Sequence, residues 1–483
     1  MNLSWRTLTR QSAVLLFFAL LGVITLSPLI FHLGTQVPGE IDFFHFNWNY
    51  WWMRHALETG QNPYYTEMVM VPFRHNLALH SLTPVWFPLY LIVEPIAGQL
   101  VATNLTLWIS VVLTGWTTTL FLRQQKIHHA LALSGGVILA LSPNMRGQLL
   151  GTHLDLIGFF WMPVLLLLWD RVARQVTQAG GIGWAALVGL ALWGAWLTDP
   201  VVMVWLALLL GPFALLTFFQ AEGWRTRARL VFLGVFAVGI MLALAWIIGP
   251  LQPLLDSDMD AFSPLSYQTA RDYALSLKVW EWQPQQGEPR GFGMLLVVVT
   301  GIALVMLVGR LFSLPLDRKT RAQQAAPLHN TLPPFSAQRG KGQGDRGKQS
   351  FPLNGRFWLL VALPPLILAL GPDITVNGTQ IPLPFRLLHN LTSGQYRVAG
   401  RFVPVATLAL IVFAGQTFTP WITRLRRPAG RGLLVGALLL VYLADTHTFV
   451  PLDVMSPPPP YQFYTAMRHE NADYVVLEVP TSP

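Results

Sequence analysis

The sequence predicts an all-α polytopic membrane protein with about eleven transmembrane helices, within a range of ten to twelve. Charged residues make up 11% of the chain, whereas a soluble protein carries about 25%. Hydrophobic residues make up 53%, and the 19 Trp and 28 Phe residues suit a protein with aromatic side chains at both membrane interfaces. At about 20 apolar residues per crossing, the 483 residues accommodate about eleven helices and their loops.

Each predicted crossing is an apolar run. The runs lie near residues 11–33, 99–121, 129–143, 154–170, 182–198, 201–219, 229–250, 291–313, 355–371, 402–419 and 432–447. The first run follows Arg6 and Arg10, is long enough to span and lacks a small-residue cleavage site, so we interpret it as an uncleaved first helix.

The orientation depends on the short segment 81–97, which contains Glu94 and three prolines. If this segment does not cross, the N-terminus is cytoplasmic and 22 of the 32 Lys and Arg residues lie on the cytoplasmic side. That distribution follows the positive-inside rule, whereas a crossing at 81–97 would reverse it after the second helix. We therefore predict an interfacial or re-entrant segment at 81–97, a cytoplasmic N-terminus, an external C-terminal tail and a location in the plasma (inner) membrane.

Residues 1–447 form the predicted transmembrane domain, which includes two segments outside the bilayer. Residues 34–98 make a long first external loop with interfacial helices. Residues 314–354, rich in Gly, Gln, Pro, Lys and Arg, are predicted to be a disordered basic cytoplasmic linker. Residues 448–483 form an external tail that includes the strand-like stretch DYVVLEVP. Because one strand cannot fold alone, we expect this tail to begin a longer soluble domain.

Composition and motifs disfavour several classes of function. The net charge of +9 comes from basic residues between apolar runs, so we exclude nucleic acid as a partner. The absence of cysteine excludes disulfides, thiolate catalysis and Cys-ligated metals. The sequence has no P-loop, no His-Glu-x-x-His and no Gly-x-Ser-x-Gly motif.

The first external loop carries the strongest functional signal. In a helix that begins at Asp42, positions 42, 45 and 49 share one face, which aligns Asp42, His45 and Asn49. Aromatic neighbours such as Trp48 would dehydrate the Asp42 carboxylate, raise its basicity and suit it to general-base catalysis. The alternative is that Asp42 and Glu40 only cap the positive end of the helix.

Further polar residues lie at the predicted external ends of other spans. His80 closes the first loop, Arg146 lies in the next external loop, and His153 and Asp155 follow it at the entry to the next helix. Asp199 lies between two apolar helices, where Asp-Pro is also an ordinary turn. The alternative for each single residue is a solvated loop position or a helix cap. Together they favour a functional site, because ionisable residues near hydrocarbon are costly.

Three arginines, Arg271, Arg397 and Arg401, lie on the predicted external side, where the positive-inside rule disfavours them. Guanidinium groups bind phosphate oxygens in a bidentate manner, so a lipid-linked phosphate or pyrophosphate would explain their position. The alternative is that they extend toward lipid headgroups.

The order of these motifs resembles one family, the bacterial membrane proteins grouped with the GT-C glycosyltransferases. Asp42 followed by WNYWW, then NPYYT, LALHSLTP and ATNLTL, resembles the family's first loop and second span, and this match is the most specific. SPNMR with GTHLDL, IPLPFRLLH, YRVAGRF and YVVLEVP resemble later parts, so the resemblance covers nearly the whole chain. The segment 314–354 departs from the family pattern, because it is longer and more basic than expected, and it is a candidate for binding a partner.

The resemblance implies a GT-C-like fold and an enzyme that takes a hexose or pentose from a polyprenyl-phosphate carrier on the non-cytoplasmic face. It also implies that Asp42 is the catalytic base, with Glu40 as its helper or as a metal ligand. The predicted substrate-binding residues are His45, His80, Arg146, His153, Asp155, Arg271, Arg397 and Arg401. The expected partners are the lipid bilayer, the polyprenyl-phosphate sugar donor and a glycan, lipid or protein acceptor.

In the predicted reaction Asp42 deprotonates the acceptor hydroxyl, the transfer inverts the sugar, and the three arginines hold the carrier phosphate. The metal requirement stays open: Glu40, Asp42 and Asp155 offer oxygen ligands for a divalent cation, but the sequence fixes no metal site. Two alternatives belong to other classes. A lipid or polysaccharide transporter would place ionisable residues deep in its spans and show inverted repeats. A non-catalytic envelope-assembly protein would tolerate loss of Asp42 and His153 together.

Overall fold

The computed structural model describes residues 5–39, 42–69, 74–257, 267–275, 292, 294–312, 355–376, 379–392, 394, 396–425, 427–446 and 451–457. Glu40, the linker 314–354 and the tail after residue 457 are predictions that lie outside these residues.

The described chain is mostly helical. The helices are α1 (Trp5–Thr25), α2 (Asp42–Glu58), α3 (Phe87–Ala97), α4 (Gln99–Gln124), α5 (His129–Ala140), α6 (Pro143–Leu150), α7 (Trp161–Arg174), α8 (Gly180–Thr198), α9 (Pro200–Gln220), α10 (Trp224–Ile248), α11 (Leu251–Leu255), α12 (Tyr267–Asp272), α13 (Met294–Phe312), α15 (Gly355–Ala369), α16 (Phe385–Leu391), α17 (Val403–Arg424) and α18 (Pro428–Asp445). Short 3-10 turns include η2 (Pro84–Trp86), η3 (Gly158–Phe160) and η6 (Ala399–Phe402).

Three antiparallel two-stranded sheets accompany the helices. β1 (Val37–Pro38) pairs with β6 (Val454–Met455), β2 (Tyr65–Thr66) with β3 (His75–Asn76), and β4 (Asp373–Val376) with β5 (Thr379–Pro382). The registers pair Val37 with Met455, Tyr65 with Asn76 and Asp373 with Pro382.

The all-α polytopic prediction is confirmed, and each of the eleven predicted runs contains a described helix. Six of the described helices are long and apolar enough to cross a membrane by themselves: α4, α8, α9, α10, α17 with the turn before it, and α18. Shorter apolar helices occur within α1, η2 and α3, α13 and α15.

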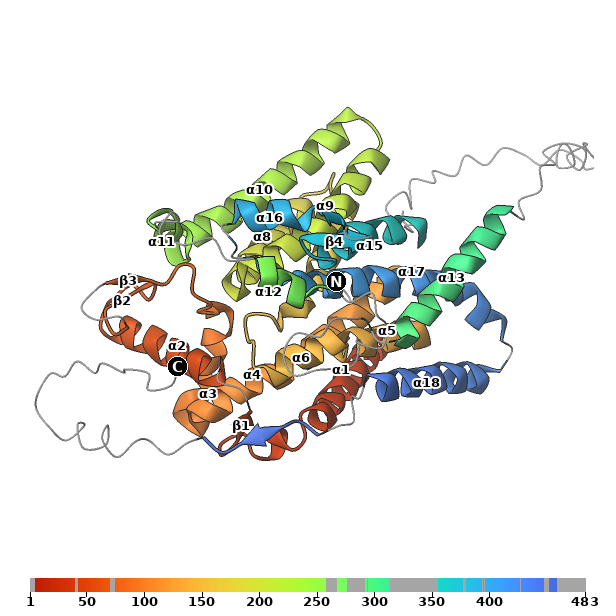
Figure 1. Ribbon diagram of the computed structural model, residues 1–483. Helices are drawn as coiled ribbons and strands as arrows, with labels where there is room; N and C mark the ends of the chain where they lie inside the picture. Colours follow the sequence, from red (N-terminus) through yellow and green to blue (C-terminus); the bar gives the residue numbers. More distant parts are fainter. Residues whose placement is uncertain are drawn as a thin grey trace, which may run out of the picture.

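The centre of the bundle is formed by α4 and α17. In their most apolar stretches 67% and 72% of residues are buried, against 22% in α10 and 17% in α18. α4 packs against α1, α3, α5 and α7, whereas α17 packs against α15, α13 and α5. α10 and α18 therefore expose apolar side chains at the periphery, as expected for helices that face lipid, and Figure 1 shows α13 and α18 at the edge opposite α2.

One predicted helix begins later than expected. We expected a span at 154–170, but α7 begins at Trp161, and residues 151–157 form turns followed by η3. Thr152 has a positive φ of 54°, which a continuous helix does not allow. Pro163 falls in the first turn of α7, where a missing N–H costs no helical hydrogen bond. His153 and Asp155 therefore lie on a loop rather than at the entry to a helix.

Contacts between loops bear on the orientation of segment 81–97. Tyr65 Oη donates a hydrogen bond to Asp256 Oδ2 (2.9 Å), and Asn76 Nδ2 donates one to the Pro253 carbonyl (2.7 Å). Segments in contact outside the bilayer lie on the same side of it, so an even number of crossings separates them. The eleven predicted crossings satisfy this condition here and for the β1–β6 pair, whereas an added crossing at 84–97 would violate both. The prediction that 81–97 does not cross is consistent with these contacts and stays a prediction.

Candidate active site

A cavity of about 1030 Å³ brings together residues from segments far apart in the sequence. Its charged and histidine lining consists of Asp42, His45, His80, His153, Asp155, Asp199, Arg397 and Arg401. Seven of these eight residues were predicted as site residues from the sequence. The fold brings these residues together, because the start of α2, two turns between helices and the segment before α17 all border this cavity.

Asp42 is the first residue of α2, and the helix begins where the sequence predicted. Its carboxylate Oδ2 lies 3.0 Å from His153 Nε2, and His153 Nδ1 lies 2.6 Å from Gln148 Oε1. The hydrogen bond from His153 lowers the pKa of Asp42 and outweighs burial, which acts in the opposite direction. The expectation that aromatic neighbours would raise the basicity of Asp42 is therefore wrong: the side chain is 50% exposed and has a strong hydrogen-bond donor.

The loop that carries His153 is held from several sides. Trp86 Nε1 donates a hydrogen bond to the Leu154 carbonyl (3.2 Å), and Ser110 Oγ donates one to the Ile157 carbonyl (2.5 Å). A Cβ atom at Gly151 would lie 2.9 Å from His153 Cε1, so only glycine leaves room for this position of the imidazole ring. The loop thus fixes the ring against Asp42.

His45 and His80 form a second pair at the cavity. Their ring centroids are 4.3 Å apart. His80 Nε2 lies 3.0 Å from Asn49 Oδ1, and the Asn49 amide donates to the Ser81 carbonyl (2.8 Å). Burial lowers the pKa of His45, and burial together with the neighbouring His45 lowers the pKa of His80 to about 4. Both rings are consequently neutral at physiological pH and act as hydrogen-bonding groups.

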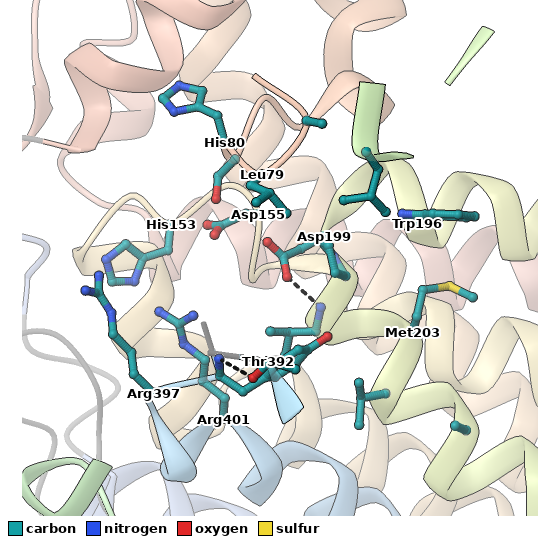
Figure 2. Close-up of a pocket in the computed structure, with 18 of the residues that line it drawn as sticks. Leu79, His80, His153, Asp155, Trp196, Asp199, Met203, Thr392, Arg397 and Arg401 are labelled. Carbon is teal, nitrogen blue, oxygen red and sulfur yellow. Dashed lines mark hydrogen bonds between the residues drawn. The ribbon is translucent and has the colours of Figure 1, made fainter. Parts of the chain in front are cut away.

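Two carboxyl groups lie deeper in the cavity. Asp155 is 8% exposed, and its Oδ1 atom has no hydrogen-bond partner among the described residues. Asp199 lies in the turn between α8 and α9, where its Oδ1 accepts a hydrogen bond from the Val201 N–H (2.6 Å). Burial, with the nearby Asp155 charge, raises the pKa of Asp199. Figure 2 shows the two carboxyl groups side by side.

Arg397 and Arg401 enter the cavity from the segment that leads into α17. Arg397 is exposed and has no ion pair with any described residue, whereas Arg401 is half-buried. Figure 2 shows both guanidinium groups on the side of His153. Arg401 lowers the pKa of both Asp42 and Asp199, although other causes have larger effects. The two arginines thus form a cationic side of the cavity.

The remaining lining is largely apolar. Its apolar part on α8, α9, α10, α11 and α16 includes Trp196, Val201, Met203, Val204, Ala207, Met241, Leu242, Leu254 and Leu391. Leu242 is 42% exposed and Leu391 is 75% exposed, so this side continues into an apolar outer surface. A ligand with a charged head and a long apolar chain matches this combination of surfaces.

Two predicted site residues lie outside the cavity lining. Arg271 on α12 forms a bidentate ion pair with Asp373 on β4 (3.0 and 2.8 Å). Arg146 is 5% exposed within α6, which begins because Ser142 caps it and Pro143 occupies its first position. A helix therefore forms where we predicted a loop, and Arg146 lies in the protein interior.

The metal question was also left open by the sequence. Among the described residues, no group of three or more His, Asp or Glu side chains has an arrangement that would hold a metal ion. Glu40, which we expected as a helper or metal ligand, lies outside those residues.

No family model matches the chain, and no curated protein matches it in sequence. The crystal structure of the Archaeoglobus fulgidus oligosaccharyltransferase in its apo form aligns with 98% of this chain and 59% of its own length, with a TM-score of 0.50 and 14% identity. The archaeal oligosaccharyltransferase AglB from Archaeoglobus fulgidus, in complex with an inhibitory peptide and a dolichol-phosphate, aligns over 96% and 58%, with 15% identity and a TM-score of 0.47.

The fold is similar to that of an oligosaccharyltransferase. The similarity to the apo structure supports the GT-C-like fold expected from the sequence, and at 14% identity it concerns the fold alone. The chain spans about three fifths of the length of the solved structures it matches.

Among the cavity residues that the predicted site lacked are Asp199, Trp196 and Tyr396. An acidic residue between two apolar helices is unusual, which pointed to Asp199. We left it out of the predicted site because Asp-Pro is also an ordinary turn. Tyr396 directly precedes Arg397, and Trp196 lies one helical turn before Asp199. Neither aromatic residue stands out in a sequence with so many aromatic side chains.

Proposed function

We propose that this chain is the membrane domain of a glycosyltransferase that moves a sugar from a polyprenyl-phosphate carrier to an acceptor hydroxyl on the non-cytoplasmic face. One observation carries the proposal: a single cavity combines the Asp42–His153 pair, two arginines and an apolar side. The similarity of the fold to an oligosaccharyltransferase supports the same class of reaction.

Different cavity residues bind different parts of the substrate. Arg397 and Arg401 bind the phosphate oxygens, because guanidinium groups match phosphate in charge and geometry. The apolar side formed by α9 and α10 accommodates the first isoprene units. Phosphate and lipid together position the anomeric carbon between the arginines and Asp42.

The transfer itself exchanges one bond for another. The acceptor hydroxyl gives its proton to Asp42, and its oxygen forms a bond to the anomeric carbon while the bond from that carbon to the phosphate oxygen breaks. The electron pair leaves with the polyprenyl phosphate, whose developing charge Arg397 and Arg401 stabilise. Attack on the face opposite the leaving group inverts the configuration. Because its pKa is lowered, Asp42 is ionised and able to accept the proton throughout the physiological pH range.

Substitution of Asp42 tests this proposal. In membranes supplied with radiolabelled polyprenyl-phosphate sugars, Asp42→Asn should lower turnover by about 100-fold or more, the usual contribution of a general base. Asp42→Glu should retain measurable turnover, and Asp272→Asn on α12, outside the cavity lining, should match the wild type. If Asp42→Asn inserts normally and keeps full turnover, the assignment of Asp42 as the base is wrong.

A further inference from the structure

Asp155 is placed in an energetically costly environment that the reaction described above does not explain. Its side chain is more than nine-tenths buried, it lines the cavity, and Oδ1 has no hydrogen-bond partner among the described residues. An unsatisfied buried carboxylate oxygen is rare, because it loses its hydration without compensation. Hydrogen bonds from Trp86 and Ser110 to the Leu154 and Ile157 carbonyls hold the backbone on both sides of Asp155. Asp155 Oδ1 can therefore accept a hydrogen bond from a ligand in the cavity.

Asp199 adds a second carboxyl group from a different part of the chain. One of its oxygens caps α9, which leaves the other facing the cavity beside Asp155 (Figure 2). The end of α8 that carries Asp199 is fixed, because Trp161 Nε1 donates to Thr198 Oγ1 (2.9 Å) and Thr198 Oγ1 donates to the Gly194 carbonyl (3.0 Å). Two carboxyl groups on well-supported segments thus line the same cavity.

Trp196 lies on the same side of the cavity as Asp199. It precedes Asp199 by three positions, so the two residues lie on one face at the end of α8. Figure 2 shows the indole ring beyond Asp199, on the side away from Arg397 and Arg401. An aromatic ring in the same cavity as carboxyl groups suits a pyranose, whose C–H face packs on the ring while its hydroxyls donate to carboxylate oxygens.

We infer that Asp155, Asp199 and Trp196 form the subsite that recognises the transferred sugar, separately from the arginines that bind its phosphate. This inference rests on the proposed function and deepens it. The carboxyl pair accepts hydrogen bonds from two sugar hydroxyls, and the indole ring packs against the sugar ring. Sugar recognition and phosphate binding are consequently assigned to different residues of one cavity.

Two lipids that differ only in the sugar test this assignment. Binding of polyprenyl phosphate and of polyprenyl-phosphate glucose, mannose or galactose is measured with the full chain in nanodiscs. Asp155→Asn, Asp199→Asn and Trp196→Leu should each bind polyprenyl phosphate as the wild type does. For the sugar that the wild type prefers, the affinity of the two Asn variants should fall by about 10- to 100-fold, as expected for loss of a hydrogen bond to a charged group. Trp196→Leu should also weaken binding of that sugar, because it removes the packing surface of the ring. Arg397→Gln and Arg401→Gln should lose affinity for both lipids alike.

The matched control lies outside the cavity lining. Trp184→Leu, on the same helix as Trp196, should change neither affinity. Equal affinity of the Asn variants and the wild type for the sugar-bearing lipid would overturn the subsite. Loss of a Mn²⁺-induced thermal shift in those variants, with sugar affinity unchanged, would assign the carboxyl pair to a cation and also overturn it. If the wild type binds neither lipid, the proposed function itself fails, which is a separate result.

Discussion

At the scale of single residues, the structure separates the three acids of the cavity by their surroundings. Asp42 is half exposed and bonded to His153, so its pKa is lowered. Asp199 is enclosed beside another carboxyl group, so its pKa is raised. Asp155 has an oxygen without a partner among the described residues. The same residue type therefore serves different purposes in one cavity.

Replacement of His153 by Phe should move the acid limb of the pH–rate profile. His153 is the largest cause of the lowered Asp42 pKa, and Phe removes its hydrogen bond while keeping a ring. In the wild type, activity is lost only as the pH falls through the lowered Asp42 pKa. In His153→Phe that loss should begin at a higher pH. The measurement is kcat/KM from neutral pH down to below the ordinary Asp value of 3.8, with the exposed His75→Phe as control. An unchanged acid limb would contradict the proposed coupling.

Replacement of Asp199 by Asn should stabilise the folded protein. Asn caps a helix as well as Asp does, so the contact with Val201 is kept. Because the folded-state pKa of Asp199 is raised, the wild type loses stability as the pH rises from the ordinary Asp value of 3.8 through the raised value. Thermal unfolding in detergent should show a gain in Tm of a few degrees for Asp199→Asn at pH 8 and a smaller gain at pH 5. A gain independent of pH would contradict this origin.

At the scale of structural elements, the important features are the turns that interrupt the helical pattern. The loop from Gly151 to Ile157 replaces the first turns of a predicted span and presents His153 and Asp155 to the cavity. The one-residue turn between α8 and α9 does the same for Asp199. An ion pair between Arg54 and Glu94 joins α2 to α3, which helps to hold the helix that begins with Asp42.

Substitution of Gly151 by Ala tests the role of its loop. The added Cβ would lie 2.9 Å from the His153 ring and push it away from Asp42. We expect at least a tenfold loss of turnover with little change in Tm, because the ring is partly exposed and can move toward the cavity. Gly183→Ala, on α8 with no atom within 4 Å of the new Cβ, is the control and should retain full turnover. Full turnover in Gly151→Ala would show that the position of His153 is not critical.

At the scale of the whole molecule, the C-terminal segment returns to the first loop. β6 pairs with β1, and Leu452, which is buried, donates its N–H to the Ser27 carbonyl (2.9 Å). The residues that follow the last described span are therefore held close to the segment that precedes α2 and Asp42. This contact also requires both segments to lie on one side of the membrane.

A designed disulfide tests this arrangement, and the natural absence of cysteine gives a clean background. Val37 and Met455 are direct partners in an antiparallel pair, and such partners have a Cα separation of about 4.5 to 5.5 Å, within disulfide range. Val37→Cys combined with Met455→Cys should cross-link on mild oxidation, as detected by peptide mass spectrometry. Val37→Cys with Gly430→Cys, at the far end of α18, should not. A cross-link only in the second variant would contradict the fold.

Much of the fold could be predicted from the sequence, because the cost of burying polar backbone and charge in lipid forces long apolar helices. The positions of α4, α8, α9 and α10 follow directly from apolar runs. The later start of α7 could not be predicted, because residues 154–160 are apolar enough to continue a helix and only the local turn at Thr152 prevents it.

Part of the candidate site could also be predicted, because charge is costly near lipid and therefore rare in this sequence. Asp42, His153 and Arg397 are conspicuous because charged and titratable groups are rare in this chain. The same criterion selected Arg271, which the structure pairs with Asp373 instead. Trp196 could not be selected, because the sequence contains many aromatic residues and nothing distinguishes this one from the others at the membrane interfaces.

The sequence by itself determined that the chain is a polytopic helical membrane protein, because hydropathy acts locally along the chain. It also indicated on which residues a polar site would depend. Only the tertiary structure decided which of these residues lie together, because that depends on which turns and loops border the same cavity. It placed Asp199 and Trp196 beside Asp155, paired Arg271 with Asp373, and lowered the pKa of Asp42 through a contact with a residue more than a hundred positions away.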